Sequence, residues 1–158
     1  QAFIVTACSE PPLATRFIQR MSLDKKSETD EFTENANEIV PGVWLGSEDA
    51  AHVSLELLRK HHIDHVVVAG FGLKPTYPDK LQYLHLKAID LPIYNICQHL
   101  SQACQFIHQA LGLGTESGSA PKETSAVLVH CARGKSRSAA IVVGYLMWSN
   151  QQTFAEAH

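Results

Sequence analysis

The sequence predicts an α/β fold: a central, mostly parallel sheet of about five strands flanked by helices. The first observation is the continuous apolar run 63–69, which is typical of a strand buried within a parallel sheet. The second is the apolar run 126–129, which is followed by a loop and then by the long apolar segment 139–148, a strand–loop–helix pattern. The third is the alternating segment 81–87, which leads through a loop into a further helical segment.

Size and composition limit the classes of function. The 158 residues suffice for one folded domain, and 45% apolar with 18% charged residues is ordinary for a soluble α/β protein. The net charge of −3 implies no general attraction to nucleic acid, and no apolar run reaches transmembrane length. The four cysteines show no CxxC pair and no metal-ligand pairing with histidine. We therefore expect a reducing compartment, cytoplasmic or nuclear, and neither a metal nor another cofactor.

The first 37 residues differ from the rest, so we expect an N-terminal extension and linker at 1–37 and the folded domain at 38–158. A helix is predicted over 12–21, either packed on the outside of the domain or docking a partner. Residues 24–37 are charged and polar, which predicts a loop. Because the chain begins with Gln1 rather than Met, we expect the natural N-terminus to lie upstream.

The domain is predicted to open with two short strands joined at Pro41-Gly42. Ser47 is a candidate N-cap for a helix that ends around His61, followed by strand 63–69. Three nearby histidines have no acidic or cysteine partner at ligand spacing and predict no metal site: His61, His62 and His65.

The loop after strand 81–87 carries one acidic residue, Asp90. Asn95 heads a capping-box-like pair and opens the next helix, so Asp90 lies between a strand end and a helix start. Ligands bind at that edge of a parallel sheet, and strand 126–129 ends at the same edge. A carboxylic acid there can protonate a leaving oxygen and then, as carboxylate, deprotonate a water. Residues 112–125 are rich in Gly, Ser and Thr and predict an inserted surface loop.

Residues 130–138 read HCARGKSRS and combine a nucleophile, an anion site and a charge clamp. Cys131 falls at the end of a predicted strand, and Arg137 falls in the first turn of a helix. Helix N-terminal N–H groups favour an anion, and a loop that curls at Gly134 can turn more of them inward. Arginine can bind two phosphate oxygens, and a cysteine in this field is expected to be a thiolate. These features predict nucleophilic attack on phosphorus.

This segment resembles the His-Cys-x5-Arg-Ser/Thr signature loop of the cysteine-dependent protein phosphatases, most closely their dual-specificity branch. The resemblance spans about 38–158 and includes Val-Pro-Gly-Val-Trp-Leu-Gly at 40–46. It implies that Cys131 forms a phosphocysteine intermediate, that Arg137 holds the phosphoryl group and that Asp90 is the general acid. It implies further that Ser138 assists departure of the sulfur and that His130 braces the loop and supports the thiolate. The residues expected to bind the substrate phosphate are Ala132, Arg133, Gly134, Lys135, Ser136 and Arg137.

The C-terminal region is predicted to be incomplete. Segment 139–148 is apolar nearly all round, so its helix should be covered on most sides. Residues 153–156 have the form of a capping box that starts another helix. Members of the family that the chain resembles continue with helices over the central one. We therefore expect that the sequence is truncated after His158 or that another element covers this helix.

The leading hypothesis is a metal-independent phosphatase acting on phosphotyrosine and phosphoserine/threonine in proteins. One alternative keeps the chemistry but takes a phosphoinositide or an inositol polyphosphate, because Arg133 and Lys135 make the loop unusually basic. Another is a non-catalytic module that binds phosphorylated partners. The presence of the complete set of expected catalytic residues favours an enzyme over that second alternative.

Overall fold

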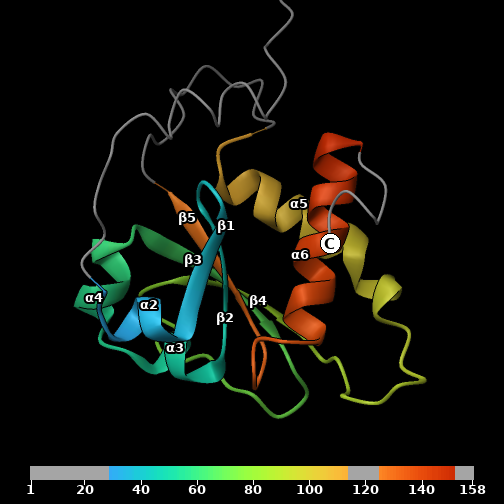
Figure 1. The fold of residues 1–158 in the computed structure, drawn as a ribbon, viewed down its shortest axis with the longest axis horizontal. Helices are drawn as coiled ribbons and strands as arrows, with labels where there is room; N and C mark the ends of the chain where they lie inside the picture. The colour runs from blue at the N-terminus through green and yellow to red at the C-terminus, as the bar shows by residue number, and fades with distance from the viewer. Residues whose placement is uncertain (1–28, 114–124, 152–158) are drawn as a thin grey trace, which may run out of the picture.

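A five-stranded sheet forms the centre of the molecule (Figure 1), whose computed structural model describes residues 29–113 and 125–151. The strand order is β1-β2-β5-β3-β4. β1 and β2 form an antiparallel hairpin, whereas β2, β5, β3 and β4 pair in parallel. The strands are β1 Ala36–Val40, β2 Val43–Gly46, β3 Ile63–Ala69, β4 Gln82–Leu86 and β5 Ala126–His130. The predicted fold class is confirmed.

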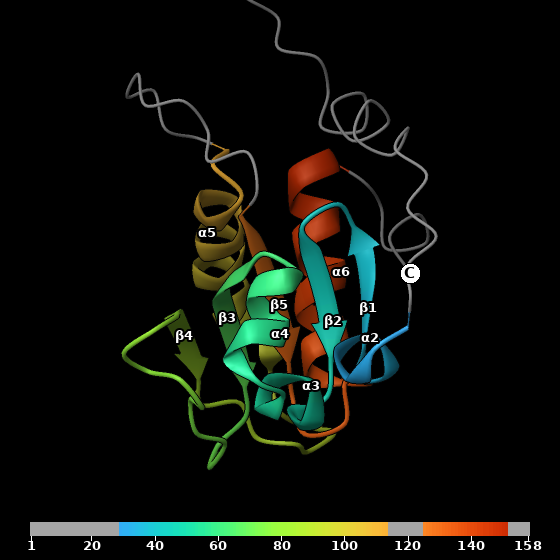
Figure 2. The ribbon, with the colours of Figure 1, turned by 90° about the vertical axis from the view of Figure 1, so that its left-hand side faces the viewer.

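Helices cover both faces of this sheet (Figures 1 and 2). On one face lie α2 Glu31–Asn35, α3 Glu48–His52 and α4 Leu55–Lys60. On the other lie the 3-10 helix η1 Ile96–His99, α5 Leu100–Ala110 and α6 Arg137–Asn150. The four parallel strands β2, β5, β3 and β4 end at one edge, and the loops that leave β4 and β5 there carry the residues of interest.

The alternation of side chains along β5 divides the core into two clusters. Val127 and Val129 pack with Ile107 of α5 and Ile141 of α6. Ala126 and Leu128 face the opposite way, among residues of α2, α3 and α4. All five residues of β5 are buried, which explains its continuous apolar character and anchors the loop that follows it.

The expected polar loop over 24–37 is wrong for the part that the structure describes. Asp30 caps helix α2, accepting from Thr33 N at 3.1 Å, and Phe32 is fully buried. The Phe32 ring lies 5.0 Å from the ring of Trp44 and 4.8 Å from that of His61, measured between centroids. One apolar residue in a charged stretch therefore becomes part of the core, and the folded domain extends N-terminally beyond Glu38.

Asp30 also ties α2 to α4 through charge. Its carboxylate lies 2.9 Å from Lys60 Nζ and 2.8 Å from His61 Nε2. Burial alone would raise the pKa of this carboxyl, but the hydrogen bonds from His61 and Lys60 hold the pKa well below its usual range. His61 therefore serves the packing of α2 on α4.

The single helix predicted from Ser47 to about His61 is in fact two. Ser47 does precede α3, but the chain becomes extended at Val53, with ψ at 166°. Ser54 then caps α4 by accepting from Leu57 N at 3.2 Å. A serine that satisfies a new helix start competes with continuation of the first helix, which explains the break.

Helix α6 is less covered than its composition predicts. Ile141, Val142, Tyr145 and Leu146 are buried, but Trp148 is 51% exposed. A groove of about 590 Å³ runs between α5 and α6, lined by Leu100, Ser101, Cys104, Gly144, Met147, Trp148 and Gln151. The predictions for 12–21, for most of 112–125 and for 153–156 lie outside the described residues. No helix in the described ranges is both long and apolar enough to cross a membrane.

Candidate active site

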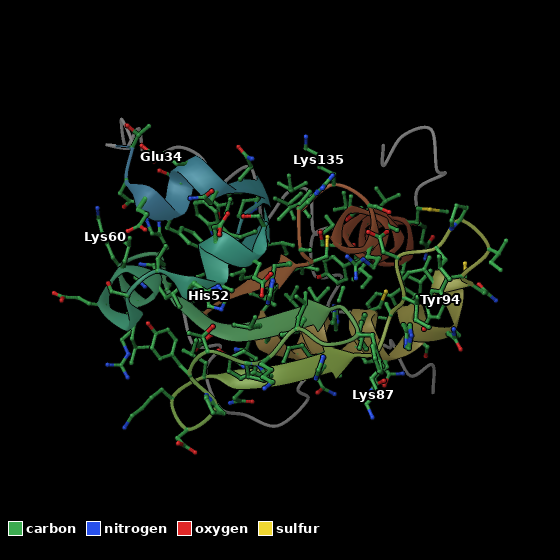
Figure 3. The ribbon with its side chains drawn as sticks, turned by 90° about the horizontal axis from the view of Figure 1, so that it is seen from below. Glu34, His52, Lys60, Lys87, Tyr94 and Lys135 are labelled. Carbon is green, nitrogen blue, oxygen red and sulfur yellow. The ribbon has the colours of Figure 1, made fainter. Side chains whose placement is uncertain are left out.

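Two loops at the carboxyl edge of the parallel strands form the site. The β5–α6 loop comprises residues 131–136, and the β4–η1 loop comprises residues 87–95. Figure 3 looks at the molecule from this side and shows Lys135 of the first loop and Lys87 of the second on opposite sides of the view. The two loops are far apart in sequence. They are close in space because only one strand, β3, separates β4 from β5 in the sheet.

The backbone of the β5–α6 loop is fixed by close packing at Gly134. This glycine has φ +70°, and a Cβ atom there would lie 2.8 Å from the carbonyl oxygen of Gly46 at the end of β2. Glu48 N, in the first turn of α3, donates to Ala132 O at 3.3 Å. Only glycine fits a left-handed conformation against a neighbouring backbone, so the curl predicted at this residue has a tertiary cause as well.

Cys131 lies at the base of this loop and is buried, with 2% exposure. The Ser138 hydroxyl donates to Cys131 Sγ at 3.2 Å. Burial alone would raise the pKa of the thiol. The hydrogen bonds from the Ser138 side chain and from the backbone N–H groups of Ser138, Arg133 and Gly134 outweigh it and lower the pKa to about 7. A substantial fraction of Cys131 is therefore the nucleophilic thiolate at neutral pH.

His130, the last residue of β5, is buried and carries no charge near neutrality. Burial lowers the pKa of its imidazole to about 4, with further lowering by His52 and His85 and an opposing hydrogen bond to the Cys131 backbone. Nδ1 of His130 has no hydrogen-bond partner in the part of the chain that the structure describes. Support of the thiolate by His130, as the resemblance implied, would therefore come from a neutral ring and its backbone contact.

Arg137 opens α6 and points its guanidinium toward the β4–η1 loop. Its Nη1 donates to Ala88 O at 3.4 Å, and its Nη2 lies 3.3 Å from Asp90 Oδ2. The side chain is 11% exposed, and Nε is buried with no partner among the described residues. Gly70 leaves space for this group, since a Cβ atom there would lie 3.2 Å from Nη1. Arg137 is thus held beside the loop of Cys131, and its Nε is a hydrogen-bond donor without an acceptor among the described residues.

Asp90 is where the sequence predicted it, in the loop between β4 and η1. Its side chain is 64% exposed and makes the ion pair with Arg137. The loop around it is tied by Tyr94, whose hydroxyl lies 2.6 Å from His99 Nε2 and 3.3 Å from Lys87 O. Asn95 caps η1 by accepting from the Cys97 N–H, as its position in the sequence indicated.

The remaining expected phosphate-binding residues lie at the surface of the loop. Ala132, Arg133, Lys135 and Ser136 are all exposed, and the last of these precedes α6 as its N-cap. Within the described ranges neither Arg133 nor Lys135 forms a salt bridge. Their positive charges are therefore available to an anionic ligand. The same ranges contain no group of three or more His, Cys, Asp or Glu placed to hold a metal ion.

The structure thus brings the predicted site residues to one sheet edge, and it adds contacts that the sequence did not reveal. The Ala88 carbonyl and the space beside Gly70 orient Arg137. The Tyr94–His99 pair braces the loop that carries Asp90. The sequence signals for these contacts are weak: one glycine directly after a buried strand, and a tyrosine five residues before a histidine.

Comparisons with known proteins agree with this geometry. The family model described as "Dual specificity phosphatase, catalytic domain" matches residues 43–158. The chain is 39% identical over 119 residues to dual specificity protein phosphatase 19 of Mus musculus, covering 75% of this chain and 49% of that protein. It is 33% identical over 158 residues to dual specificity protein phosphatase 26 of Bos taurus, covering 96% of this chain and 70% of that protein. The chain therefore spans only about half of the mouse relative.

Solved structures give the same assignment. The crystal structure of a point variant of human DUSP28 matches with a TM-score of 0.66 at 26% identity, covering 78% of this chain and 77% of that one. The human tyrosine phosphatase-like serine/threonine/tyrosine-interacting protein matches with a TM-score of 0.65 at 30% identity, covering 77% of this chain and 78% of that one. On its sequence and its fold, the chain belongs to the dual specificity phosphatase family.

Proposed function

We propose that this chain is a cysteine-dependent, metal-independent phosphatase that hydrolyses phosphotyrosine and phosphoserine/threonine in proteins through a phosphocysteine intermediate. The observation that carries the proposal is the environment of Cys131. Its buried sulfur accepts hydrogen bonds from the Ser138 hydroxyl and from backbone N–H groups of the β5–α6 loop, which lower its pKa to about 7. Such a sulfur is a nucleophile at the floor of a site already suited to an anion.

In the first step the Cys131 thiolate attacks phosphorus, an S–P bond forms and the ester P–O bond breaks. The leaving oxygen takes a proton from Asp90, which makes it a better leaving group. Arg137 neutralises the equatorial phosphoryl oxygens with two donors, and the buried, unpartnered Nε supplies one of them. The N–H groups at the start of α6 favour the same negative charge.

In the second step water attacks the phosphocysteine. Asp90, now a carboxylate, takes a proton from the water, and the S–P bond breaks to release phosphate and the thiolate. The Ser138 hydroxyl, 3.2 Å from Sγ, stabilises the sulfur as it regains its charge. After the second step Asp90 is protonated again, and Cys131, with Ser138 as its donor, is a thiolate again. The site has returned to its starting state.

The Arg137–Asp90 ion pair gives the cycle an order. Without substrate, Arg137 Nη2 lies 3.3 Å from the Asp90 carboxylate. A phosphoryl group that binds in the β5–α6 loop offers stronger acceptors to the guanidinium than one exposed carboxylate does. Substrate binding would thereby release Asp90 toward the leaving oxygen. A thiolate nucleophile also requires a reducing environment, and we propose the cytoplasm or the nucleus.

The decisive experiment is replacement of the nucleophile. Cys131→Ser should lower turnover of a small chromogenic phosphate ester by at least about 10⁴-fold, because a serine hydroxyl is not ionised at neutral pH. The matched control is Cys97→Ser, which changes an exposed free cysteine outside the site and should keep full activity. Full activity in Cys131→Ser would refute the mechanism.

A second candidate substrate class is favoured by one observation, the two exposed cations of the β5–α6 loop. Arg133 and Lys135 could bind additional phosphates of a phosphoinositide or an inositol polyphosphate. Turnover of phosphotyrosine and phosphothreonine peptides should be compared with turnover of these compounds, using wild type and the Arg133→Ala/Lys135→Ala double variant. A preference for polyphosphates that disappears in the double variant would favour the second candidate; a preference for peptides that persists would favour proteins.

A non-catalytic, phosphate-binding role is the remaining alternative. One structural neighbour is described as phosphatase-like and as an interacting protein. In the present chain all four expected residues are present, Ser138 donates to Cys131 and Arg137 pairs with Asp90, which supports turnover. The chromogenic ester assay on the wild-type protein separates the two roles.

A further inference from the structure

An exposed apolar surface lies next to the proposed acid. Among the described residues six large apolar side chains are markedly exposed, and four of them lie on the two loops that follow β3 and β4. The other two, Ile39 and Trp148, lie on β1 and near the end of α6. We call the group of four the apolar rim: Phe71, Ile89, Leu91 and Ile93, with Ile93 92% and Phe71 71% exposed. A concentration of exposed apolar groups at one edge of a domain marks an interaction site more often than scattered ones do.

Hydrogen bonds connect this rim to the reacting groups. The Phe71 N–H donates to Ala88 O at 2.9 Å, and the same oxygen accepts from Arg137 Nη1 at 3.4 Å. Ile89 and Leu91 flank Asp90 in sequence, and Asp90 pairs with Arg137. The rim therefore adjoins both groups that are proposed to act on the phosphoryl group. It neighbours Asp90 along the chain and shares the Ala88 carbonyl with Arg137.

The rim is also held in place before any partner arrives. The Tyr94 N–H donates to Leu91 O at 2.9 Å, which closes a turn around Ile93. The Tyr94 hydroxyl is bound to His99 and to the Lys87 carbonyl, and Asn95 caps η1. A surface whose backbone is already ordered loses less conformational entropy on binding, so its apolar area contributes more fully to affinity.

The β5–α6 loop differs from the apolar rim in its chemistry. Its exposed side chains include Arg133 and Lys135, and no large apolar group is among them. A substrate that contacts both the β5–α6 loop and the apolar rim would therefore meet positive charge at the first and apolar surface at the second. A polypeptide, which carries varied side chains on either side of its phosphate, matches both.

We propose that the apolar rim determines sequence preference by binding an apolar side chain close to the phosphorylated residue of a polypeptide substrate. The inference rests on the proposed function and specifies its substrate class. Insertion of the rim into a lipid surface fits less well, since Asp90 lies between Ile89 and Leu91 and its carboxylate would have to leave water. A single leucine, isoleucine or phenylalanine of a substrate can contact part of the rim and leave that carboxylate in water.

The test is a leucine scan of the substrate. A tyrosine-phosphorylated peptide with only alanine, serine and glycine around the phosphotyrosine serves as reference, and one leucine is moved through the three positions on each side. For wild type, at least one position should raise kcat/KM by about tenfold, mainly through KM, as expected for burial of one aliphatic side chain. The Phe71→Ser/Ile93→Ser variant should lose this preference, whereas its kcat/KM for a small chromogenic ester should stay at the wild-type value.

The matched control is Ile39→Ser, which removes a similarly exposed apolar side chain from β1, away from the site. It should keep the leucine preference. A leucine effect that survives in the rim variant, or its absence at all positions in wild type, overturns the inference, as does rim-dependent binding to phosphatidylcholine vesicles. If wild type hydrolyses neither ester nor peptide, the proposed function fails, and binding of the same peptides to the Cys131→Ser protein decides the rim separately.

Discussion

The two loops of the site are built in opposite ways. The β5–α6 loop starts from a strand that is buried along its whole length, and its Cys131 and Ser138 are buried as well. The β4–η1 loop follows the strand at the edge of the sheet, and the Asp90 side chain is 64% exposed. One ion pair holds Asp90, and a tyrosine–histidine contact ties the loop around it. In the proposed mechanism the phosphoryl group, which is the same in every substrate, binds at the buried loop. The leaving group and the rest of the substrate, which vary, bind at the exposed loop.

The most direct way to test this division is to remove the acid and leave the rigid loop intact. Asp90→Asn should lower kcat/KM for alkyl phosphates by about 10²- to 10³-fold, because their oxygens need a proton to leave, but by much less for nitrophenyl phosphate. The rates are measured on a series of esters of graded leaving-group pKa. Asp79→Asn, in the preceding loop, is the control and should follow wild type. Equal losses across the series would assign the proton to another group.

The rigidity of the β5–α6 loop can be tested through its glycine. Gly134→Ala places a Cβ 2.8 Å from Gly46 O at φ +70°, so the free energy of unfolding should fall by about 3 kcal/mol and activity by more than about tenfold. Gly72→Ala is the matched control, since its φ is +89° but no atom lies within 4 Å of the new Cβ. That variant should lose only about 1 kcal/mol. Chemical denaturation measures both, and similar losses in the two variants would contradict the difference between the loops.

The buried hydrogen bonds to sulfur predict a pH dependence. The Cys131 pKa is lowered to about 7, so the thiolate fraction, and with it kcat/KM, should fall about tenfold per pH unit below that value. Ser138→Ala removes a donor to the thiolate and should move this limb to higher pH. Because phosphate esters titrate near pH 6 themselves, the rate of inactivation by iodoacetamide should be measured in parallel. A limb that does not move in Ser138→Ala would exclude Cys131 as its origin.

The smallest expected effect concerns the brace of the exposed loop. Tyr94→Phe removes the hydroxyl that contacts His99 and the Lys87 carbonyl. Turnover of alkyl phosphates should fall about threefold, while the free energy of unfolding should change by less than about 1 kcal/mol. In the Asp90→Asn background the same substitution should have no further effect, because it acts through the position of the acid. An additive loss in that double variant would assign Tyr94 a separate role.

The fold was predictable to the extent that it depends on local patterns. The turn at Pro41-Gly42, the buried strand β3 and the strand–loop–helix around Cys131 follow from residues that are neighbours in sequence. The predicted loop before Glu38 and the unbroken helix from Ser47 were wrong. Phe32 is buried only because Trp44 and His61 lie where it packs, and a charged stretch contains no local sign of this.

The candidate site shows the same limit. The position of Asp90 was predictable from the topology of parallel sheets, which places the ends of β4 and β5 at one edge. The orientation of Arg137 by the Ala88 carbonyl and the neutral state of His130 could not be found in this way. Both depend on burial and on groups far away in the sequence, and spacing along the chain measures neither.

By itself, then, the sequence determined the order and kind of most elements and was enough to predict a chemistry for residues 130–138. That is because the cysteine, glycine and arginine there lie within one loop and one helix turn, where their spacing along the chain limits the distances between them. Only the tertiary structure decided that Arg137 meets Asp90, that hydrogen bonds lower the Cys131 pKa to about 7 and that the loop of Phe71 is bound to the loop of Asp90 at Ala88. These properties arise from contacts between loops that leave different strands, and such contacts exist only after the sheet has assembled.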